Sequence, residues 1–251
     1  MILKEKVIIV TGAARGIGKV YAKGIAEAGG KVVVADILDG DSTLEEVRQA
    51  GGEALCVYTD VSDEQSVQAL AETANNHFGR VDGLVNNAAM FAGMTYHPFD
   101  QITVEEWDRV MAVNVKGPWL AARAVYPFMK ARGAGKIINI ASGAPFKGIP
   151  LFSHYSVSKG AVVALTRVLA RSMGKDGICV NTVAPGFTHT DILIATREDL
   201  EAVDVAEVAS RAIPRTEYPE DLAGAIVFFL SSGADFITGQ TLLVDGGSYM
   251  L

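Results

Sequence analysis

The sequence contains few of the residues that build disulfide frameworks or metal centres. It has two cysteines and four histidines among 251 residues. Cys56 and Cys179 each lie inside an apolar segment, far apart in the chain, which indicates buried free thiols rather than a disulfide. The histidines show no ligand spacing, so we expect no structural metal.

The sequence also lacks an excess of positive charge and a long apolar run. The net charge is −7, which argues against nucleic acid and anionic membranes as partners. No apolar run approaches transmembrane length, and the first residues lack the pattern of a signal peptide. We therefore expect a cytoplasmic protein that binds neither nucleic acid nor membrane.

Short apolar runs of strand length are present throughout and alternate with helical patterns. Short connections join them, which is typical of an α/β fold with a doubly wound, Rossmann-like parallel sheet in a single domain over residues 1–251. We predict strands at 7–10, 31–36, 54–58, 81–85, 136–140, 178–183 and 241–245. We predict helices from the glycine-rich turn to 28, over 44–50 and 63–78, from 103, from 153, and over 222–230.

A glycine-rich turn links the first strand to the first helix. Gly12, Gly16 and Gly18 would let the backbone approach a pyrophosphate at the helix N-terminus. The spacing differs from the usual dinucleotide pattern Gly-x-Gly-x-x-Gly, and a turn without a ligand is the competing interpretation. Asp36 ends the second strand about twenty residues further on, where a carboxylate would accept hydrogen bonds from an adenosine ribose.

Tyr155 and Lys159 are four residues apart at the start of a predicted helix, and hence on one face. A free phenol has a pKa of about 10 and is a poor base at neutral pH. A nearby ammonium favours the phenolate and lowers that pKa, so the tyrosine could act as an acid/base. The spacing alone is weak evidence, because an exposed tyrosine at a helix start would look the same.

Taken together, these motifs resemble the short-chain dehydrogenase/reductase family over nearly the whole chain. Ala89 departs from the usual glycine and Thr188 from a common aliphatic residue. The motifs that carry the resemblance are Thr11-Gly12-x-x-x-Gly16-x-Gly18, Asp60-Val61, Asn86-Asn87-Ala88, Asn114, Ser142, Tyr155-x-x-x-Lys159 and Pro185-Gly186.

The resemblance implies hydride transfer between a nicotinamide cofactor and an alcohol or carbonyl carbon. The implied catalytic residues are Asn114, Ser142, Tyr155 and Lys159. The implied cofactor-binding residues are Gly12, Arg15, Gly16, Ile17, Gly18, Asp36, Asp60, Val61, Asn87, Ala88, Tyr155, Lys159, Pro185, Gly186, Thr188 and Thr190.

The proline four residues after Asn114 indicates how the backbone is bonded at Asn114. On an α-helix the carbonyl of residue 114 would accept the N–H of residue 118, but Pro118 has none and clashes with that carbonyl. We expect a bend there and a carbonyl able to hold the water that, in the family, relays protons from Lys159. A proline that merely bends the helix is the alternative.

The cofactor predicted from the residues is NAD. The Asp36 carboxylate would repel the 2′-phosphate of NADP, and Ile37 follows it in place of a basic residue. Arg15 argues the other way, since a base in the glycine turn can reach a 2′-phosphate. We judge the carboxylate to be decisive.

The expected substrate is a neutral, largely apolar secondary alcohol, aromatic or cyclic, that is converted to its ketone. Its pocket should include a loop and helices around 187–215, and Lys147 should point to water rather than clamp an anion. The predicted pocket residues are Phe91, Met94, Ser142, Phe152, His154 and Phe187.

Two other functions fit the sequence less well. An NADPH-dependent 3-oxoacyl reductase would share the fold, and a non-catalytic nucleotide-sensing scaffold would usually have lost Tyr155 or Lys159. The helix at 222–230 is apolar nearly all round and the strand at 241–245 should be an edge strand. Both features, with the family resemblance, predict a homotetramer, and a well-buried helix in a monomer is the alternative.

Overall fold

The computed structural model describes residues 1–91, 94, 97–196 and 199–250. Its centre is a seven-stranded parallel sheet in the order β3-β2-β1-β4-β5-β6-β7. The strands are β1 (Val7–Thr11), β2 (Lys31–Asp36), β3 (Ala54–Tyr58), β4 (Gly83–Asn86), β5 (Gly135–Ile140), β6 (Ile178–Pro185) and β7 (Thr241–Val244).

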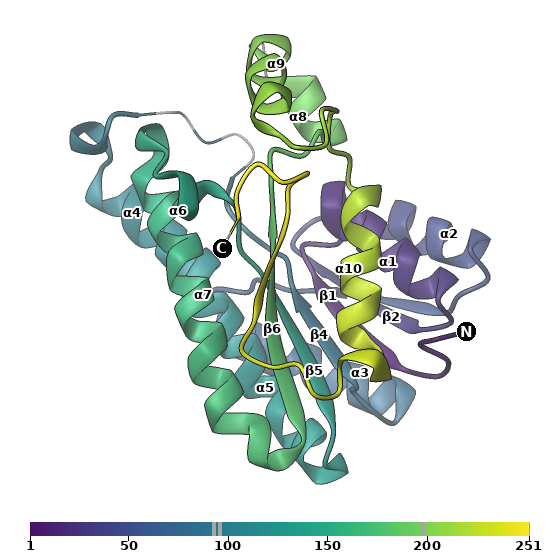
Figure 1. Cartoon of the computed structure of the whole chain (residues 1–251). Helices are drawn as coiled ribbons and strands as arrows, with labels where there is room; N and C mark the ends of the chain where they lie inside the picture. Colours follow the sequence, from purple (N-terminus) through teal and green to yellow (C-terminus); the bar gives the residue numbers. More distant parts are fainter. Residues whose placement is uncertain (92–93, 95–96, 197–198, 251) are drawn as a thin grey trace.

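Helices cover both faces of the sheet (Figure 1). One layer holds α1 (Gly16–Glu27), α2 (Asp41–Gln49) and α10 (Glu220–Leu230), and the other holds α3 (Glu64–Phe78), α5 (Gly117–Arg132) and α7 (Ser153–Met173). The remaining α-helices are α4 (Val104–Met111), α6 (Ala144–Lys147), α8 (Asp191–Thr196) and α9 (Leu200–Ser210). Short helices are η1 (Phe99–Gln101), η2 (Ala112–Lys116), η3 (Pro150–Phe152), η4 (Gly174–Asp176) and η5 (Ser232–Ala234).

The apolar run of β1 explains why the sheet is covered twice. Val7 and Ile9 pack into the core beneath α3, α5 and α7. Ile8 and Val10 point to the opposite face and pack beneath α1, α2 and α10. Because successive side chains of a strand alternate between faces, an uninterrupted apolar strand requires a helical layer on each side.

Most of the predicted elements are confirmed, with shifted ends. β4 begins at Gly83 rather than 81, and α2 begins at Asp41 rather than 44. β7 lies at the sheet edge as expected. Both cysteines are free, as predicted, but they are only partly buried, so the predicted burial was wrong. In the described ranges, no helix has the length and apolarity needed to cross a membrane.

The long helix predicted from residue 103 is interrupted. Thr103 caps its start, its hydroxyl accepting the Glu106 N–H at 3.1 Å. The segment η2 is a π-helix, and the Gly117 N–H donates to the carbonyl of Ala112, five residues back. Pro118 lacks the N–H that an α-helical bond to residue 114 requires, which explains why the chain takes a wider turn there.

A buried hydrogen-bond network that no sequence motif predicted joins three strands to α7 beneath this turn. The Asn86 amide donates to the Asn139 side chain, which donates to the Thr166 hydroxyl, both at 2.8 Å. Thr182 also donates to Thr166, at 2.7 Å. The Asn86 amide, the Asn139 side chain and both threonine hydroxyls are hydrogen-bonded, so their burial is compensated.

Candidate active site

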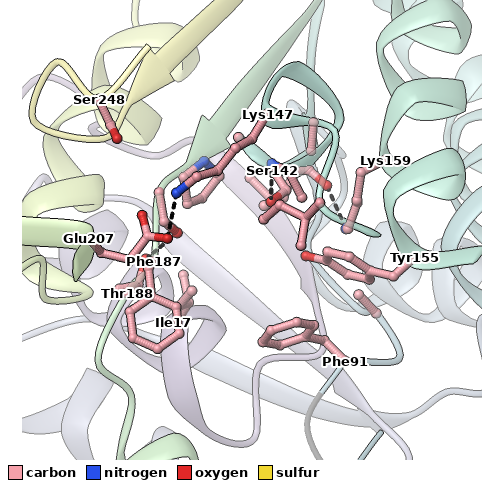
Figure 2. Close-up of a pocket in the computed structure, with 18 of the residues that line it drawn as sticks. Ile17, Phe91, Ser142, Lys147, Tyr155, Lys159, Phe187, Thr188, Glu207 and Ser248 are labelled. Atoms are coloured by element: carbon pink, nitrogen blue, oxygen red, sulfur yellow. Dashed lines mark hydrogen bonds and ion pairs between the residues drawn. The ribbon is translucent and has the colours of Figure 1, made fainter. Parts of the chain in front are cut away.

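A cavity opens at the carboxyl ends of the strands, where ligands bind in sheets of this kind (Figure 2). Its described lining includes many of the residues predicted from the sequence. These are Ile17, Asn87, Phe91, Ser142, Phe152, Tyr155, Lys159, Pro185, Gly186, Phe187, Thr188 and Thr190. The loop after β4, the stretch between β5 and Tyr155, and the segment after β6 therefore meet at one place.

Tyr155 stands in the first turn of α7 and is held by aromatic neighbours. Its ring centroid lies 4.7 Å from that of Phe91 and 5.7 Å from that of Phe152. The side chain is largely buried and faces the cavity (Figure 2). The tyrosine therefore presents its hydroxyl from a rigid, apolar wall.

Lys159 lies one helical turn further on and is buried beside the tyrosine. Its ammonium nitrogen is 5.6 Å from the Tyr155 ring centroid and donates to the Ile140 carbonyl at 2.8 Å. Burial lowers the pKa of Lys159 to about 8. Burial therefore disfavours the charged form of this lysine, and such perturbed groups cluster at functional sites.

Ser142 lies two residues beyond the end of β5 and lines the same cavity. Its hydroxyl oxygen accepts the Ala144 N–H at 3.1 Å. This bond caps the start of α6 and leaves the hydroxyl hydrogen able to donate. The serine thus combines the local capping role with a position facing Tyr155.

Asn114 does not line the cavity but supports it through contacts that the sequence did not predict. Its side-chain oxygen accepts the Met90 N–H at 2.8 Å, and its amide donates to the Met90 carbonyl at 3.2 Å. The amide also donates to the Ser158 hydroxyl at 3.1 Å, which in turn donates to the Tyr155 carbonyl at 2.7 Å. Asn114 therefore joins the loop after β4 to the turn that carries Tyr155.

The glycine-rich turn has the close packing that a pyrophosphate site needs. Gly12 has φ +65°, and a side chain there would place its Cβ 2.7 Å from the Cα of Ala88. Gly16 has φ +56°, and a Cβ on Gly18 would collide with the Gly12 carbonyl. Larger residues would force apart the two loops that meet at the start of α1.

Asp36 holds the same turn in place from the end of β2. Its carboxylate oxygens accept the N–H groups of Ala14, at 2.9 Å, and Leu38, at 3.0 Å. The side chain is buried, while Arg15 is exposed. Asp36 argues for NAD and Arg15 for NADP, and of these two side chains Asp36 is the one fixed at the turn.

The second predicted loop is tied to the glycine turn by Thr11. Its hydroxyl oxygen accepts the N–H groups of Asn87 and Ala88, both at 3.1 Å. The Asn87 amide donates to the carbonyls of Thr11 and Gly12, at 3.0 and 2.9 Å. Both loops therefore form one rigid surface.

The Asp60-Val61 pair lies in the connection between β3 and α3. The Asp60 carboxylate accepts the N–H and the hydroxyl of Ser62, at 2.8 and 2.7 Å. Val61 is buried against Gly117, where a Cβ would come within 3.1 Å of the valine. The Asp60 side chain therefore stabilises its own loop. The Asp60 backbone lies beside the edge of the sheet.

The segment after Pro185-Gly186 packs on a buried acid, Glu217, that no sequence motif predicted. The Thr188 hydroxyl donates to Glu217 at 2.7 Å, and a Cβ on Gly186 would lie 2.7 Å from the same carboxylate. Burial raises the pKa of Glu217 to about 7. Thr190 has a local role as well, since its hydroxyl accepts the Leu193 N–H at 3.2 Å at the start of α8.

Two predicted pocket residues are not part of the described cavity lining. His154 is fully buried with its Nε2 atom 3.3 Å from Glu106, because it faces α4 rather than the cavity. Met94 also lies outside the lining. Lys147, expected to point to water, instead lines the cavity and pairs with Glu207.

These features fit a dinucleotide with a nicotinamide ring. The glycine turn leaves room for a pyrophosphate at the N-terminus of α1, and Asp36 stands where the adenosine ribose would lie. The nicotinamide end would reach the cavity beside Tyr155 and Lys159. The arrangement can therefore bring a redox cofactor against an acid/base group in an apolar enclosure.

Known proteins are similar to this chain over nearly its whole length. The family model described as enoyl-(acyl carrier protein) reductase matches residues 12–249. Galactitol 2-dehydrogenase of Agrobacterium fabrum is 38% identical, with 100% of both chains covered. Cis-4-hydroxycyclohexanecarboxylate dehydrogenase of Sinomonas cyclohexanicum is 39% identical over 97% of this chain and 96% of the relative.

A solved structure is similar over the whole fold. It is provisionally described as an NAD(P)-dependent gluconate 5-dehydrogenase from Beutenbergia cavernae, with NADP bound at low occupancy. It is 36% identical and has a TM-score of 0.90, with 98% of this chain and 97% of that chain covered. The chain belongs to the short-chain dehydrogenase/reductase family, whose members are oxidoreductases that bind a nicotinamide cofactor.

Proposed function

We propose that the protein is a cytoplasmic NAD-dependent oxidoreductase that interconverts a neutral, largely apolar secondary alcohol, aromatic or cyclic, and its ketone. The observation that carries the proposal is the cavity in which Ser142, Tyr155 and the buried Lys159 meet aromatic side chains. Pockets of this composition bind mainly apolar ligands through a few convergent polar groups.

Each polar residue has a distinct role in this proposal. The bound nicotinamide supplies the group that exchanges hydride with the substrate. The Ser142 hydroxyl donates to the substrate oxygen and holds it beside the Tyr155 phenol. Tyr155 takes the alcohol proton as general base, or returns it in the reverse direction. The charged form of Lys159 favours the phenolate through its proximity.

Asn114 completes the proposed machinery through its backbone. Pro118 cannot donate to the Asn114 carbonyl, and the π-helix η2 surrounds that residue. The carbonyl would hold a water that passes protons between Lys159 and solvent. The side chain keeps this segment fixed against Met90 and Ser158.

The preference for NAD rests on Asp36. Its carboxylate is held at the end of β2 by two backbone N–H groups. A 2′-phosphate there would meet a like charge in a shielded site, whereas ribose hydroxyls could donate to it. Comparable catalytic efficiency with NADP would contradict this assignment. A largely oxidised cellular NAD pool would favour alcohol oxidation.

The runner-up is an NADPH-dependent 3-oxoacyl reductase, since a relative from Synechocystis with the name 3-oxoacyl-[acyl-carrier-protein] reductase is 37% identical over 99% of this chain. A non-catalytic nucleotide-binding scaffold of the same fold is less well supported because both Tyr155 and Lys159 line the cavity. We also propose a homotetramer. Its support is the exposed apolar surface on α10 and β7, where Phe228 and Leu242 are 41% and 40% exposed.

The test of the proposed function is turnover by the purified protein with a substrate panel. It compares 1-phenylethanol and cyclic alcohols with hydroxy acids, sugars and acyl thioesters, each with NAD or NADP. Tyr155→Phe keeps the ring and removes the hydroxyl, so turnover should fall at least about a hundredfold while NAD binding persists. Near-normal turnover by this variant, or a clear preference for acyl thioesters with NADPH, would contradict the proposal.

A further inference from the structure

The cavity has a second polar wall that the proposed chemistry does not use. In Figure 2 the side chains of Lys147 and Glu207 lie on the side of the cavity away from Tyr155 and Lys159. The Lys147 ammonium and the Glu207 carboxylate are 2.6 Å apart, with side chains 34% and 18% exposed. Such a close ion pair in the wall of a largely apolar cavity calls for a functional explanation.

Three separate segments build this wall. Lys147 is the last residue of α6, which starts directly after Ser142, and Glu207 belongs to α9. The C-terminal segment closes the third side, since the Lys147 nitrogen lies 5.6 Å from the Tyr249 ring centroid. The Ser248 hydroxyl is 2.6 Å from that of Ser210 on α9. We call this wall, formed by Lys147, Glu207, Ser248 and Tyr249, the distal wall.

The C-terminal segment is held in place by Asp245. Its carboxylate accepts the N–H groups of Gly247, Ser248 and Tyr249, at 2.9, 3.2 and 3.0 Å. Asp245 is itself buried. The distal wall is therefore preorganised, in the sense that its polar groups do not need to be ordered when a ligand arrives.

Lys147 keeps its positive charge in this wall. Burial alone would lower the pKa of the Lys147 ammonium, but its contacts with Glu207 and Tyr249 raise that pKa overall. The lysine is therefore charged at neutral pH. Arg211, which also lines the cavity, is occupied elsewhere, because its guanidinium donates to the carbonyls of Arg215 and Phe187.

We infer that the distal wall is a specificity subsite for a second, neutral hydroxyl group on the substrate. The inference rests on the proposed function and refines its substrate class to a cyclic alcohol with a second hydroxyl across the ring. A hydroxyl can accept from the Lys147 ammonium and donate to the Glu207 carboxylate at once. A carboxylate would face the charge of Glu207, and a purely apolar group would shield the pair without replacing its hydrogen bonds to water.

The experiment compares substrates that differ only at the far side of the ring. The wild-type enzyme is assayed with cyclohexane-1,4-diol, 4-methylcyclohexanol and cis-4-hydroxycyclohexanecarboxylate in the presence of NAD. After correction for its two equivalent carbinols, the diol should have a kcat/KM at least about tenfold above that of the methyl compound, the gain expected from one charge-assisted hydrogen bond. The carboxylate should be the poorest of the three.

Two variants and two controls locate the effect. Lys147→Met and Glu207→Gln should each reduce the diol-to-methyl ratio to near one. Glu201→Gln, on the exposed part of the same helix, and Lys175→Met, an exposed lysine in η4, should keep the wild-type ratio. A wild-type ratio of one, a preference for the carboxylate, or a ratio that both distal-wall variants retain would overturn the inference.

The two proposals fail in different ways. If the panel alcohols are oxidised but the diol has no advantage, the inference fails and the proposed function stands. If no alcohol is oxidised, the proposed function fails, and the subsite is decided by thermal unfolding with NAD present. The diol should then raise Tm more than 4-methylcyclohexanol in the wild type but not in Lys147→Met, and equal shifts would overturn the subsite as well.

Discussion

Lys159 shows how the protein makes one side chain serve both the fold and the site. Its nitrogen donates to the Ile140 carbonyl, at the end of the inner strand β5, and lies 5.6 Å from the centroid of the Tyr155 ring. Removal from water disfavours the ammonium, which lowers the pKa from 10.5 to about 8. The fold therefore bears a cost for keeping this lysine charged below that pH.

This cost predicts a pH-dependent stability. Below about pH 8 the lysine is protonated in both the folded and the unfolded chain, so the full penalty is present. Between about 8 and 10.5 the unfolded chain binds more protons, so the free energy of unfolding rises with pH. The slope from this group is at most about 1.4 kcal/mol per pH unit, with a total of about 3 kcal/mol.

The measurement is urea unfolding of wild type and Lys159→Met at pH 7, 8, 9 and 10. The variant lacks the titrating group, so the wild type should gain stability relative to it across this range. Lys175→Met removes an exposed lysine and should show the wild-type pH profile. Parallel profiles for wild type and Lys159→Met would show that burial of this ammonium carries no such penalty.

The motif residues that line the cavity could be brought together from the sequence, because the proposed chemistry restricts the residue type at each position. Contacts between side chains that are far apart in the sequence could not be predicted in this way. The amide of Asn114 binds Met90 and Ser158, 24 and 44 residues away, and no local pattern encodes those partners. His154 was misplaced because a residue next to Tyr155 in sequence faces a different side of the helix.

At the scale of elements, the π-helix η2 is the feature with the clearest cause in the sequence. Pro118 predicts an interrupted hydrogen-bond pattern, but a bend and a π-turn both satisfy that condition. The structure has the π-turn, packed beside α7 with Asn114 buried at its centre. The strands were easier to predict. A short, uninterrupted apolar run such as Val7–Val10 is typical of a strand that is buried on both faces.

Pro118→Ala should therefore separate stability from function. The new N–H can donate to the Asn114 carbonyl, which favours a regular α-helix and removes the proposed water site. We expect an unchanged or higher Tm and a kcat at least several-fold lower, with the loss largest where proton transfer limits turnover. The pH dependence of kcat and the Tm of the NAD-bound enzyme give the two readouts.

Pro127→Ala is the matched control for this change. Pro127 lies inside the same helix α5 but is exposed and about ten residues beyond Pro118. Replacement there also restores an N–H, so stability should change in the same direction while kcat stays at the wild-type value. Equal effects of both substitutions on kcat would mean that Pro118 acts only through helix stability.

At the scale of the whole molecule, the fold class follows from the alternation of strands and helices, while the assembly does not. The order of the strands brings the ends of β1, β4, β5 and β6 together at the cavity. Ser142 and Thr188, 46 positions apart, therefore line one space. The distal wall was not predicted because Lys147 and Glu207 are 60 residues apart and meet only after α9 folds over the sheet edge.

The proposed tetramer would cover apolar surface that a single chain leaves exposed. Phe236, between α10 and β7, is fully exposed, and Phe228 and Leu242 flank it in sequence with two-fifths of their surface exposed. A phenylalanine in water gains about 1.5–3 kcal/mol when it is buried, so a subunit contact at this edge would stabilise both chains. β7 is also an edge strand of the sheet, and covering it protects its unpaired backbone groups.

Phe236→Asp should weaken this assembly. A carboxylate at the contact would have to be buried without a partner, so sedimentation at micromolar concentration should show a shift from tetramer to smaller species. Tyr58→Asp changes an aromatic residue that is 72% exposed on β3, at the opposite edge of the sheet, and should leave the assembly intact. A wild-type protein that sediments as a monomer, or an unchanged tetramer in Phe236→Asp, would exclude this surface as the subunit interface.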